Sequence, residues 1–207
     1  MARSSRFSEW LDSAVWRNYL SRPMECLVGV LQYLRITPNI LTLIGLLIGG
    51  TAAYLAAVGA FFTAGMVFLL AGSFDILDGA FARRTGRVTA FGALLDSFAD
   101  RVQEACLLLG LLVYYQLRGE TGPVLLVYLA LVSSMLVSYV RARAEALGVK
   151  AMRVGYMARP QRVIIISIGL LIGQPPVALG IVAALAFSTA LQRVIHARRA
   201  MGEKQLH

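Results

Sequence analysis

The stretch FDILDGAFARRTGRVTAFGALLDSFADR, residues 74–101, decides the fold because it sets acidic side chains into otherwise apolar sequence. Asp75 and Asp78 are three residues apart, and Asp96 and Asp100 are four apart. At both spacings the two side chains share one face of a helix, about one turn apart. The short connection between the pairs predicts antiparallel neighbouring helices. We therefore expect the four carboxylates to converge on one site near the ends of both helices.

Apolar residues dominate on both sides of this stretch. The chain has 207 residues, 58% of them hydrophobic and 15% charged, whereas soluble domains average about 45–50% apolar and about 25% charged residues. This composition excludes a soluble enzyme, a disordered chain and a coiled coil. One crossing needs about 20 residues, so the chain has room for roughly six. We predict an all-α polytopic membrane protein with six transmembrane helices, at residues 39–60, 62–84, 90–117, 122–147, 159–174 and 176–199.

The N-terminal arm, residues 1–36, has a different pattern. Apolar residues from Trp10 to Tyr19 recur at helical spacing between charged residues, which predicts an amphipathic helix lying in the membrane interface. The sequence Thr37-Pro38-Asn39 then marks the start of the first span. We interpret the chain as one integral membrane domain, residues 1–207, made of this arm and a six-helix bundle at residues 39–199.

Basic residues are distributed unevenly among the connections. Arg118 follows the third span, whereas the other 19 of the 20 Lys and Arg residues fall at the alternate end of the bundle. Basic residues hold membrane loops on the cytoplasmic side. The distribution therefore predicts a multi-pass protein of the cell (inner) membrane with both termini in the cytoplasm. It also explains the net charge of +9 without a nucleic acid partner, and we expect none.

Four carboxylates inside membrane spans need a compensating partner. One charged residue near the middle of a span costs roughly 2.5–3.5 kcal/mol, and four would cost on the order of 10 kcal/mol. Oxygen ligands without histidine or cysteine favour a hard cation, Mg²⁺ or Mn²⁺, and four aspartates suffice for two ions. The structural alternative is pairing of the aspartates with Arg83, Arg84 and Arg101. Glu104, one turn deeper, is expected to pair with an arginine.

Small residues complete a pattern around the aspartates. Gly79 and Ala82 follow Asp78, and Gly92 lies one turn before Asp96, which predicts close approach by a ligand, with Arg83 meeting a phosphate. The whole pattern is Asp75-x2-Asp78-Gly79-x2-Ala82-Arg83-x8-Gly92-x3-Asp96-x3-Asp100. It resembles the signature of the CDP-alcohol phosphotransferase family, and the six-span layout fits that family as well.

The resemblance implies a reaction and a donor site. Members of the family displace CMP from a CDP-linked lipid or alcohol, with a second alcohol as acceptor. Asp75, Asp78, Asp96 and Asp100 would hold two divalent cations, and Asp100 would also act as general base. The residues implied to bind the CDP-lipid, with diacylglycerol or archaeol tails, are Asn39, Thr42, Gly79, Ala82, Arg83, Thr89 and Gly92. The resemblance also implies membrane lipids as surroundings and a homodimer.

A second cluster of basic residues bears on the acceptor. It begins in the segment SYVRARAE, residues 138–145, and its arginines lie at span edges near the level of the aspartates. Clustered guanidinium groups suit a phosphate. The cluster resembles the prokaryotic phosphatidylinositol-phosphate synthases and their archaetidylinositol-phosphate counterparts, which implies transfer to inositol phosphate. The residues implied to bind the acceptor phosphate are Ser138, Arg141, Arg143, Arg159, Arg162 and Arg193.

Three alternatives stay open on the sequence. Glycerol phosphate as acceptor would make the protein a phosphatidylglycerophosphate synthase. A cation or proton transporter would also carry buried carboxylates, although its site is expected near the midplane of the membrane. A membrane prenyltransferase would bind diphosphate through aspartates but leaves the small residues of the pattern unexplained. Release of CMP from a CDP-lipid, dependent on a divalent cation and an acceptor, would distinguish a phosphotransferase with either acceptor from the transporter and the prenyltransferase.

Overall fold

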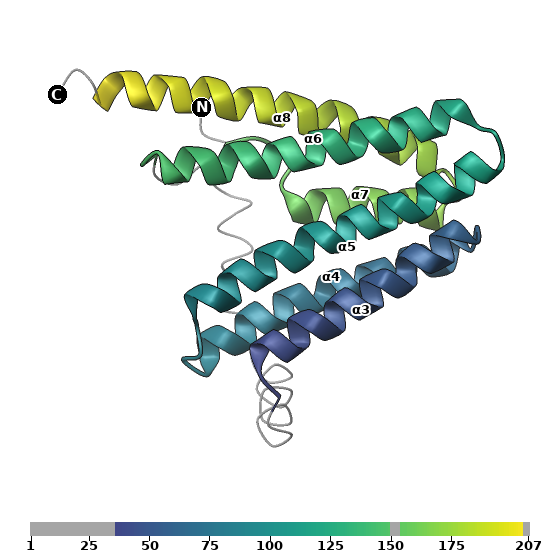
Figure 1. Cartoon of the computed structure of the whole chain (residues 1–207), viewed down its shortest axis with the longest axis horizontal. Coiled ribbons are helices and arrows are strands. Elements are labelled where there is room, and N and C mark those ends of the chain that lie inside the picture. Colours follow the sequence, from purple (N-terminus) through teal and green to yellow (C-terminus); the bar gives the residue numbers. More distant parts are fainter. Residues whose placement is uncertain (1–35, 150–153, 205–207) are drawn as a thin grey trace, which may run out of the picture.

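The computed structural model describes residues 36–149 and 154–204, and within them every regular element is a helix. This confirms the predicted all-α class. The amphipathic helix expected within residues 1–36 falls outside the described residues, apart from Ile36. The helices are α3 (Pro38–Ala57), α4 (Phe61–Arg84), α5 (Ala90–Leu117), α6 (Thr121–Ala146), α7 (Arg159–Leu171) and α8 (Pro175–Lys204), shown in Figure 1.

The helix boundaries follow local sequence signals. Thr37 has extended backbone angles and accepts a hydrogen bond from the Ile40 backbone N–H at 3.4 Å, and Pro38 occupies the first turn of α3. Gly59, in the connection between α3 and α4, has a φ of 83°, a conformation that glycine adopts without strain. The predicted breaks between spans therefore correspond to the observed connections.

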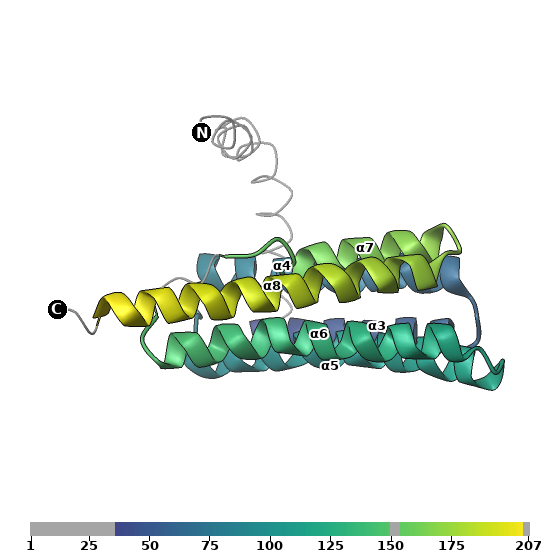
Figure 2. The same cartoon turned by 90° about the horizontal axis from the view of Figure 1, so that it is seen from above.

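The helices form two layers. One layer contains α3, α5 and α6, and the other contains α4, α7 and α8 (Figure 2). Within the bundle, α3 packs on α4 and α5, α6 packs on α8, and α7 packs on both α4 and α8. The start of α3, the α4–α5 connection and the ends of α6 and α8 lie toward the same end of the bundle (Figure 1). The acidic pairs and the arginine-rich segments are thereby brought to one end.

Small residues let α3 and α5 approach closely. A Cβ atom added at Gly110 would lie 2.1 Å from the carbonyl oxygen of Ala53, and Ala52 and Ala56 are fully buried beside it. Large apolar side chains such as Leu47 and Leu117 are exposed instead, at 73% and 80%. An outer surface that exposes large apolar side chains suits a lipid surrounding.

The predicted spans differ in how well they match a bilayer. Within the described residues, α3, α4, α6 and α8 are long and apolar enough to cross a membrane. The predicted span at 159–174 ends earlier, at Leu171, and α7 has 13 residues, which gives about 20 Å against about 30 Å of hydrocarbon. The helix stops there because Gly173 has a φ of 68°. The six-helix bundle is confirmed, and the number of complete crossings stays a prediction.

Candidate active site

The four predicted aspartates lie in the halves of α4 and α5 next to their connection. These two helices are not the close neighbours that the sequence predicts, because they lie in different layers and α3 packs on both (Figure 2). Asp75 and Asp78 come from α4, and Asp96 and Asp100 from α5. Asp78 is 4% exposed and accepts a hydrogen bond from the Thr42 hydroxyl on α3, with 2.5 Å between the oxygens. Through this bond α3, which packs on both α4 and α5, contributes to the same polar site.

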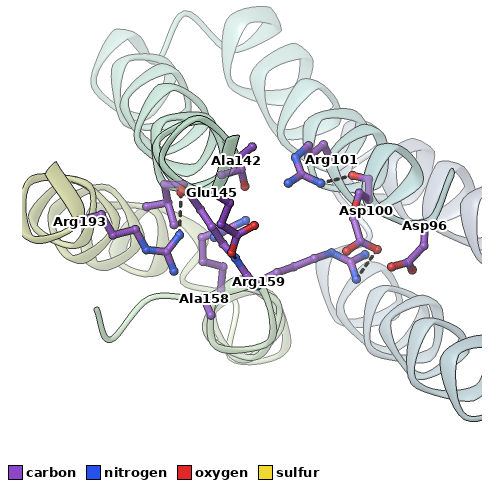
Figure 3. Close-up of a pocket in the computed structure, with 13 residues that line it drawn as sticks. Asp96, Asp100, Arg101, Ala142, Glu145, Ala158, Arg159 and Arg193 are labelled. Carbon is purple, nitrogen blue, oxygen red and sulfur yellow. Dashed lines mark hydrogen bonds and ion pairs between the residues drawn. The ribbon is translucent and has the colours of Figure 1, made fainter. Parts of the chain in front are cut away.

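Arg159, the first residue of α7, reaches into this site. Its guanidinium forms ion pairs with Asp75 and with Asp100, the latter at 2.7 Å. Figure 3 shows its side chain extending to Asp100, with Asp96 beside them. The two carboxylates bonded to Arg159 come from different helices, so the arginine links α4, α5 and α7. The alternative partners Arg83, Arg84 and Arg101 form no ion pair with the aspartates within the described residues.

All seven residues predicted to bind the CDP-lipid line one cavity. It has a volume of about 270 Å³ and lies between α3, α4 and α5, with Asp78 and Asp96 in its wall. The predicted residues in its lining are Asn39, Thr42, Gly79, Ala82, Arg83, Thr89 and Gly92. The structure therefore brings this set together, and we call this space the nucleotide cavity.

Glycines in the nucleotide cavity make room for polar side chains. A Cβ atom at Gly92 would lie 2.9 Å from the Thr89 hydroxyl oxygen and 3.2 Å from the Asn39 side-chain oxygen. Thr89 also caps α5, because its hydroxyl accepts a hydrogen bond from the Gly92 N–H at 2.9 Å. A Cβ atom at Gly79 would lie 3.2 Å from an Arg83 guanidinium nitrogen. Larger residues at either glycine would push these groups out of position.

A second cavity, of about 350 Å³, lies among α5, α6, α7 and α8 (Figure 3). We call it the acceptor cavity. Asp96 and Asp100 form one wall, and Glu145 is a further acidic residue in its lining. The predicted phosphate-binding residues that line it are Ser138, Arg141, Arg159, Arg162 and Arg193.

Arg143 is the exception in the predicted acceptor set. It lines a different groove between α6 and α8, together with Tyr139 and Arg198. Two residues along a helix correspond to a rotation of about 200°, so Arg141 and Arg143 cannot face the same cavity. The structure does not bring Arg143 to the site.

Arg162 lines the acceptor cavity, but its guanidinium is hydrogen-bonded to other residues of the protein. It is 2% exposed, and its Nε and Nη2 each donate to a different oxygen of Glu104 at 2.7 Å. Nη1 donates to the carbonyl of Met157 at 3.4 Å. The expected pairing of Glu104 with an arginine is confirmed, and this bidentate pair joins α5 to α7.

Arg193 is a buried cation of a different kind. It is 4% exposed and donates from Nε to the Val154 carbonyl at 3.0 Å and from Nη1 to the Val137 carbonyl at 2.7 Å. Within residues 36–149 and 154–204 it forms no ion pair with a carboxylate. Neutral carbonyls accept hydrogen bonds from Nε and Nη1 only, and the neighbouring Arg141 and Arg162 add repulsion that Glu145 offsets in part. This part of the acceptor cavity therefore favours an anion.

Sequence reasoning missed Gln103. It is fully buried, and its Oε1 accepts a hydrogen bond from Arg159 Nη2 at 2.9 Å. A Cβ atom at Gly49 would lie 2.7 Å from Gln103 Cγ, and one at Gly45 would lie 3.3 Å from Gln103 Nε2, so these two glycines of α3 provide the space for this glutamine. The available signal was its place on α5, seven residues after Asp96 and therefore on the same helix face.

Sequence reasoning also missed Glu145 as a site residue. It lines the acceptor cavity and pairs with Arg141 Nε at 3.0 Å. The only signal in the sequence was the spacing of four residues between these two, which is common in ordinary exposed helical pairs.

A third cavity, of about 360 Å³, opens between α4, α5 and α7. Its lining combines apolar side chains, among them Leu69, Ile76 and Val163, with Asp75, Asp96, Asp100 and Arg159. We call it the lipid cavity. Asp96 lines all three cavities, so the nucleotide, acceptor and lipid cavities meet at this carboxylate.

The donor atoms of the site suit a hard divalent cation. All four side chains at the centre are carboxylates, and Asp75 Oδ1 is buried without a hydrogen-bond partner within the described residues. The Arg159 guanidinium lies between Asp75 and Asp100. In the described part of the chain, no three acidic, histidine or cysteine side chains surround one common point at ligating distance. The fit to a metal therefore rests on donor chemistry and on the unpartnered oxygen.

Comparison with known proteins identifies the family of this chain. Residues 35–194 match the family model for CDP-alcohol phosphatidyltransferase. The chain is 37% identical over 183 residues to the archaetidylinositol phosphate synthase of Pyrococcus horikoshii, covering 88% of this chain and 95% of that protein.

Solved structures give the same result. The phosphatidylinositol phosphate synthase of Mycobacterium tuberculosis with CDP-DAG bound matches with a TM-score of 0.80 and 29% identity, over 86% of this chain and 94% of that one. The same protein in complex with manganese and citrate matches with a TM-score of 0.79 and 29% identity, over 84% and 88% of the two chains. This chain is a multi-pass membrane enzyme that belongs to the CDP-alcohol phosphatidyltransferase family, as its aspartate signature predicts.

Proposed function

We propose that this enzyme transfers a lipid phosphate group from a CDP-lipid to a hydroxyl of inositol phosphate and releases CMP. The observation that carries the proposal is the position of Asp96 at the junction of the nucleotide, lipid and acceptor cavities. A group transfer needs both reactants close together and oriented at the reacting atoms. Three cavities with a common carboxylate provide that proximity.

The donor would extend across two cavities. The cytidine and diphosphate suit the nucleotide cavity, where Arg83 supplies positive charge and glycines leave space for the ligand. The tails, of diacylglycerol or archaeol, suit the apolar side of the lipid cavity between α4 and α7. The likeness to a mycobacterial synthase with CDP-DAG bound supports this use of the site.

Asp75, Asp78, Asp96 and Asp100 would hold two divalent cations, Mg²⁺ or Mn²⁺. Bound cations of this kind neutralise a diphosphate and make its departure easier. The likeness to a synthase in complex with manganese supports a metal in this position. Glu104 would not take part, because both of its oxygens are bonded to Arg162.

The acceptor would lie along the acceptor cavity. Its phosphate suits the end at Arg193, where a buried guanidinium forms no ion pair within the described residues, with Ser138 and Arg141 in the same cavity lining. Arg159, which also lines the cavity, pairs with Asp75 and Asp100 at the other end. Its reacting hydroxyl would lie at Asp100, which accepts the proton as the oxygen attacks phosphorus. A bond forms from that oxygen to phosphorus, and the bond from phosphorus to the CMP oxygen breaks. Arg162 would support the cavity wall through Glu104 and Met157.

The same arrangement implies a location and an assembly. Since the arginines gather at the end of the bundle that holds the site, both termini and the acceptor cavity would face the cytoplasm in the cell membrane. The acceptor and CMP would then exchange with the cytoplasm, while the lipid stays in the bilayer. Homodimer formation stays a prediction of the family resemblance.

The test is turnover by the purified protein in lipid nanodiscs with radiolabelled CDP-diacylglycerol. CMP release is expected only with both Mg²⁺ and inositol phosphate present, and a chelator should abolish it. The Asp100→Asn protein, prepared identically, measures the background. Preference for glycerol phosphate over inositol phosphate in an acceptor panel would identify a phosphatidylglycerophosphate synthase instead. Absence of CMP release with every acceptor, together with cation or proton flux in vesicles, would favour a transporter.

A further inference from the structure

Glu145 is an acidic residue in a cavity whose other long side chains are mostly basic. It extends from α6 into the acceptor cavity, which Arg141, Arg159, Arg162 and Arg193 also line. Its Oε1 accepts a hydrogen bond from Arg141 Nε at 3.0 Å. Its Oε2 makes no hydrogen bond within the described residues, and the side chain is 41% exposed. One carboxylate oxygen is therefore available to a ligand.

A carboxylate in this position is unfavourable for binding a bare anion. It repels a phosphate and offsets part of the charge that the arginines supply. Asp96 and Asp100, the other acidic residues of the cavity, are accounted for as proposed metal ligands. Glu145 lies on a different helix, where it forms an ion pair with Arg141 and its charge also acts favourably on Arg193. Neither interaction occupies Oε2, which leaves this oxygen without an assigned role.

The position of Glu145 along the cavity suggests that reason. Figure 3 shows Arg193 on one side of it and Arg159 with Asp100 on the other. In the proposed acceptor orientation, the phosphate lies toward Arg193 and the reacting hydroxyl at Asp100. The middle of the acceptor, where a cyclic polyol carries its remaining hydroxyls, then lies against Glu145. An ionised carboxylate only accepts hydrogen bonds, and hydroxyl groups are suitable donors.

We infer that Glu145 determines acceptor specificity by accepting hydrogen bonds from the ring hydroxyls of a polyol phosphate. The inference rests on the proposed function and names the part of the acceptor that this residue would recognise. Arg141 would hold the carboxylate in position through Oε1 and leave Oε2 for the ligand. The arginines would then select the phosphate, and Glu145 would select the polyol.

The Glu145→Gln variant distinguishes this role from a purely electrostatic one, because the two roles predict opposite changes in the KM for inositol phosphate. If Glu145 only pairs with Arg141, removal of its charge relieves repulsion, and the KM for inositol phosphate falls or stays the same. If it accepts hydrogen bonds from hydroxyls, a charge-assisted bond becomes a neutral one, and the KM rises roughly tenfold. Inorganic phosphate, as a competitive inhibitor without hydroxyl-bearing carbons, should inhibit the variant as well as the wild type or better.

Two further variants complete the test. Glu145→Asp keeps the charge but withdraws the oxygens by one methylene, so its KM for inositol phosphate should also rise. Glu120→Gln neutralises an exposed carboxylate at the other end of α6. It should leave the KM for inositol phosphate and the inhibition by inorganic phosphate unchanged. The KM for the CDP-lipid should stay constant in all three variants.

The outcomes distinguish the two proposals. An unchanged or lower KM for inositol phosphate in Glu145→Gln and Glu145→Asp overturns the role of Glu145 while the proposed function stands. Weaker inhibition by inorganic phosphate in Glu145→Gln also overturns it, because a phosphate-binding role would then explain the loss. Failure of the wild-type protein to release CMP with inositol phosphate overturns the proposed function itself.

Discussion

The carboxylates between α4 and α5 and the arginines among α6, α7 and α8 are held in different ways. Asp75 keeps a buried oxygen without a partner, and Asp96 borders three cavities without a hydrogen bond to another described residue. Arg162, by contrast, is bonded to both oxygens of Glu104 and to the Met157 carbonyl. Arg193 is intermediate, because it bonds to two carbonyls but forms no ion pair within the described residues. The aspartates thus have unused bonding capacity, whereas the bonds of Arg162 are internal.

This difference distinguishes side chains that can take part in the reaction from side chains that stabilise the fold. A side chain with free oxygens near a cavity can respond to a ligand, so its replacement should affect the reaction. A side chain whose bonds are all internal sets the shape of the cavity, so its replacement should affect stability. Residue type alone does not distinguish these roles, because arginine serves in both.

The largest effect is expected in the acidic half. Asp100→Asn should lower turnover by roughly 10²–10⁴, because it removes both a general base and a proposed metal ligand. CMP release by the purified variant measures this, and a thermal unfolding curve close to that of the wild type shows that the fold survives. Near-normal CMP release would contradict the roles of Asp100 as general base and metal ligand. It would also remove the proposed difference between the aspartates and the arginines.

The next effect concerns the buried pair in the basic half. Arg162→Met should lower the free energy of unfolding by about 3–5 kcal/mol, because it leaves the Glu104 carboxylate buried and unpaired. Unfolding in mixed micelles measures the loss, and the double variant Arg162→Met/Glu104→Leu should recover most of it. A stable single variant with a raised acceptor KM would instead make Arg162 a phosphate ligand.

A smaller effect should distinguish the arginines that line the acceptor cavity from Arg143. Arg193→Gln should raise the KM for a phosphorylated acceptor by about tenfold or more, with the KM for the CDP-lipid changed little. The matched variant Arg143→Gln faces the other groove and should change the acceptor KM less than twofold. Equal losses for both substrates in Arg193→Gln would argue against a role in acceptor binding.

The smallest effect is expected at the glycine pair that accommodates Gln103. Gly49→Ala should cost about 1–3 kcal/mol of unfolding free energy, because its Cβ would lie 2.7 Å from Gln103 Cγ. Gly50→Ala is the control, since a Cβ there meets no atom within 4 Å. Equal stability of the two variants would show that Gln103 moves freely and does not hold Arg159.

The acidic half could be predicted from the sequence because its geometry is local. Residues 74–101 form two helices and one short turn, and helical periodicity alone directs the paired aspartates to common faces. The predicted nucleotide residues lie in or next to these two helices and α3, and all of them line one cavity. The helix order was predictable for the same reason, since glycines and prolines interrupt the apolar runs.

The basic half could not be predicted in the same detail because its contacts are distant in sequence. Arg162 pairs with Glu104, 58 residues away, and Arg193 bonds to a carbonyl 56 residues away. Nothing in the local sequence distinguishes these bonds from contacts with a substrate. Gln103 was not predicted because an uncharged side chain does not stand out in an apolar span as a charged residue does.

The short length of α7 has a consequence for access. Figure 1 shows α7 beginning well inside the ends of α6 and α8, and its 13 residues leave about 10 Å of a bilayer's hydrocarbon depth without helix at that end. At that end the non-helical residues 154–158 lead into α7, and Ala158 and Arg159 line the acceptor cavity. In the proposed function, a water-soluble alcohol would reach the level of the reacting lipid through this cavity, so neither reactant would have to leave its own phase.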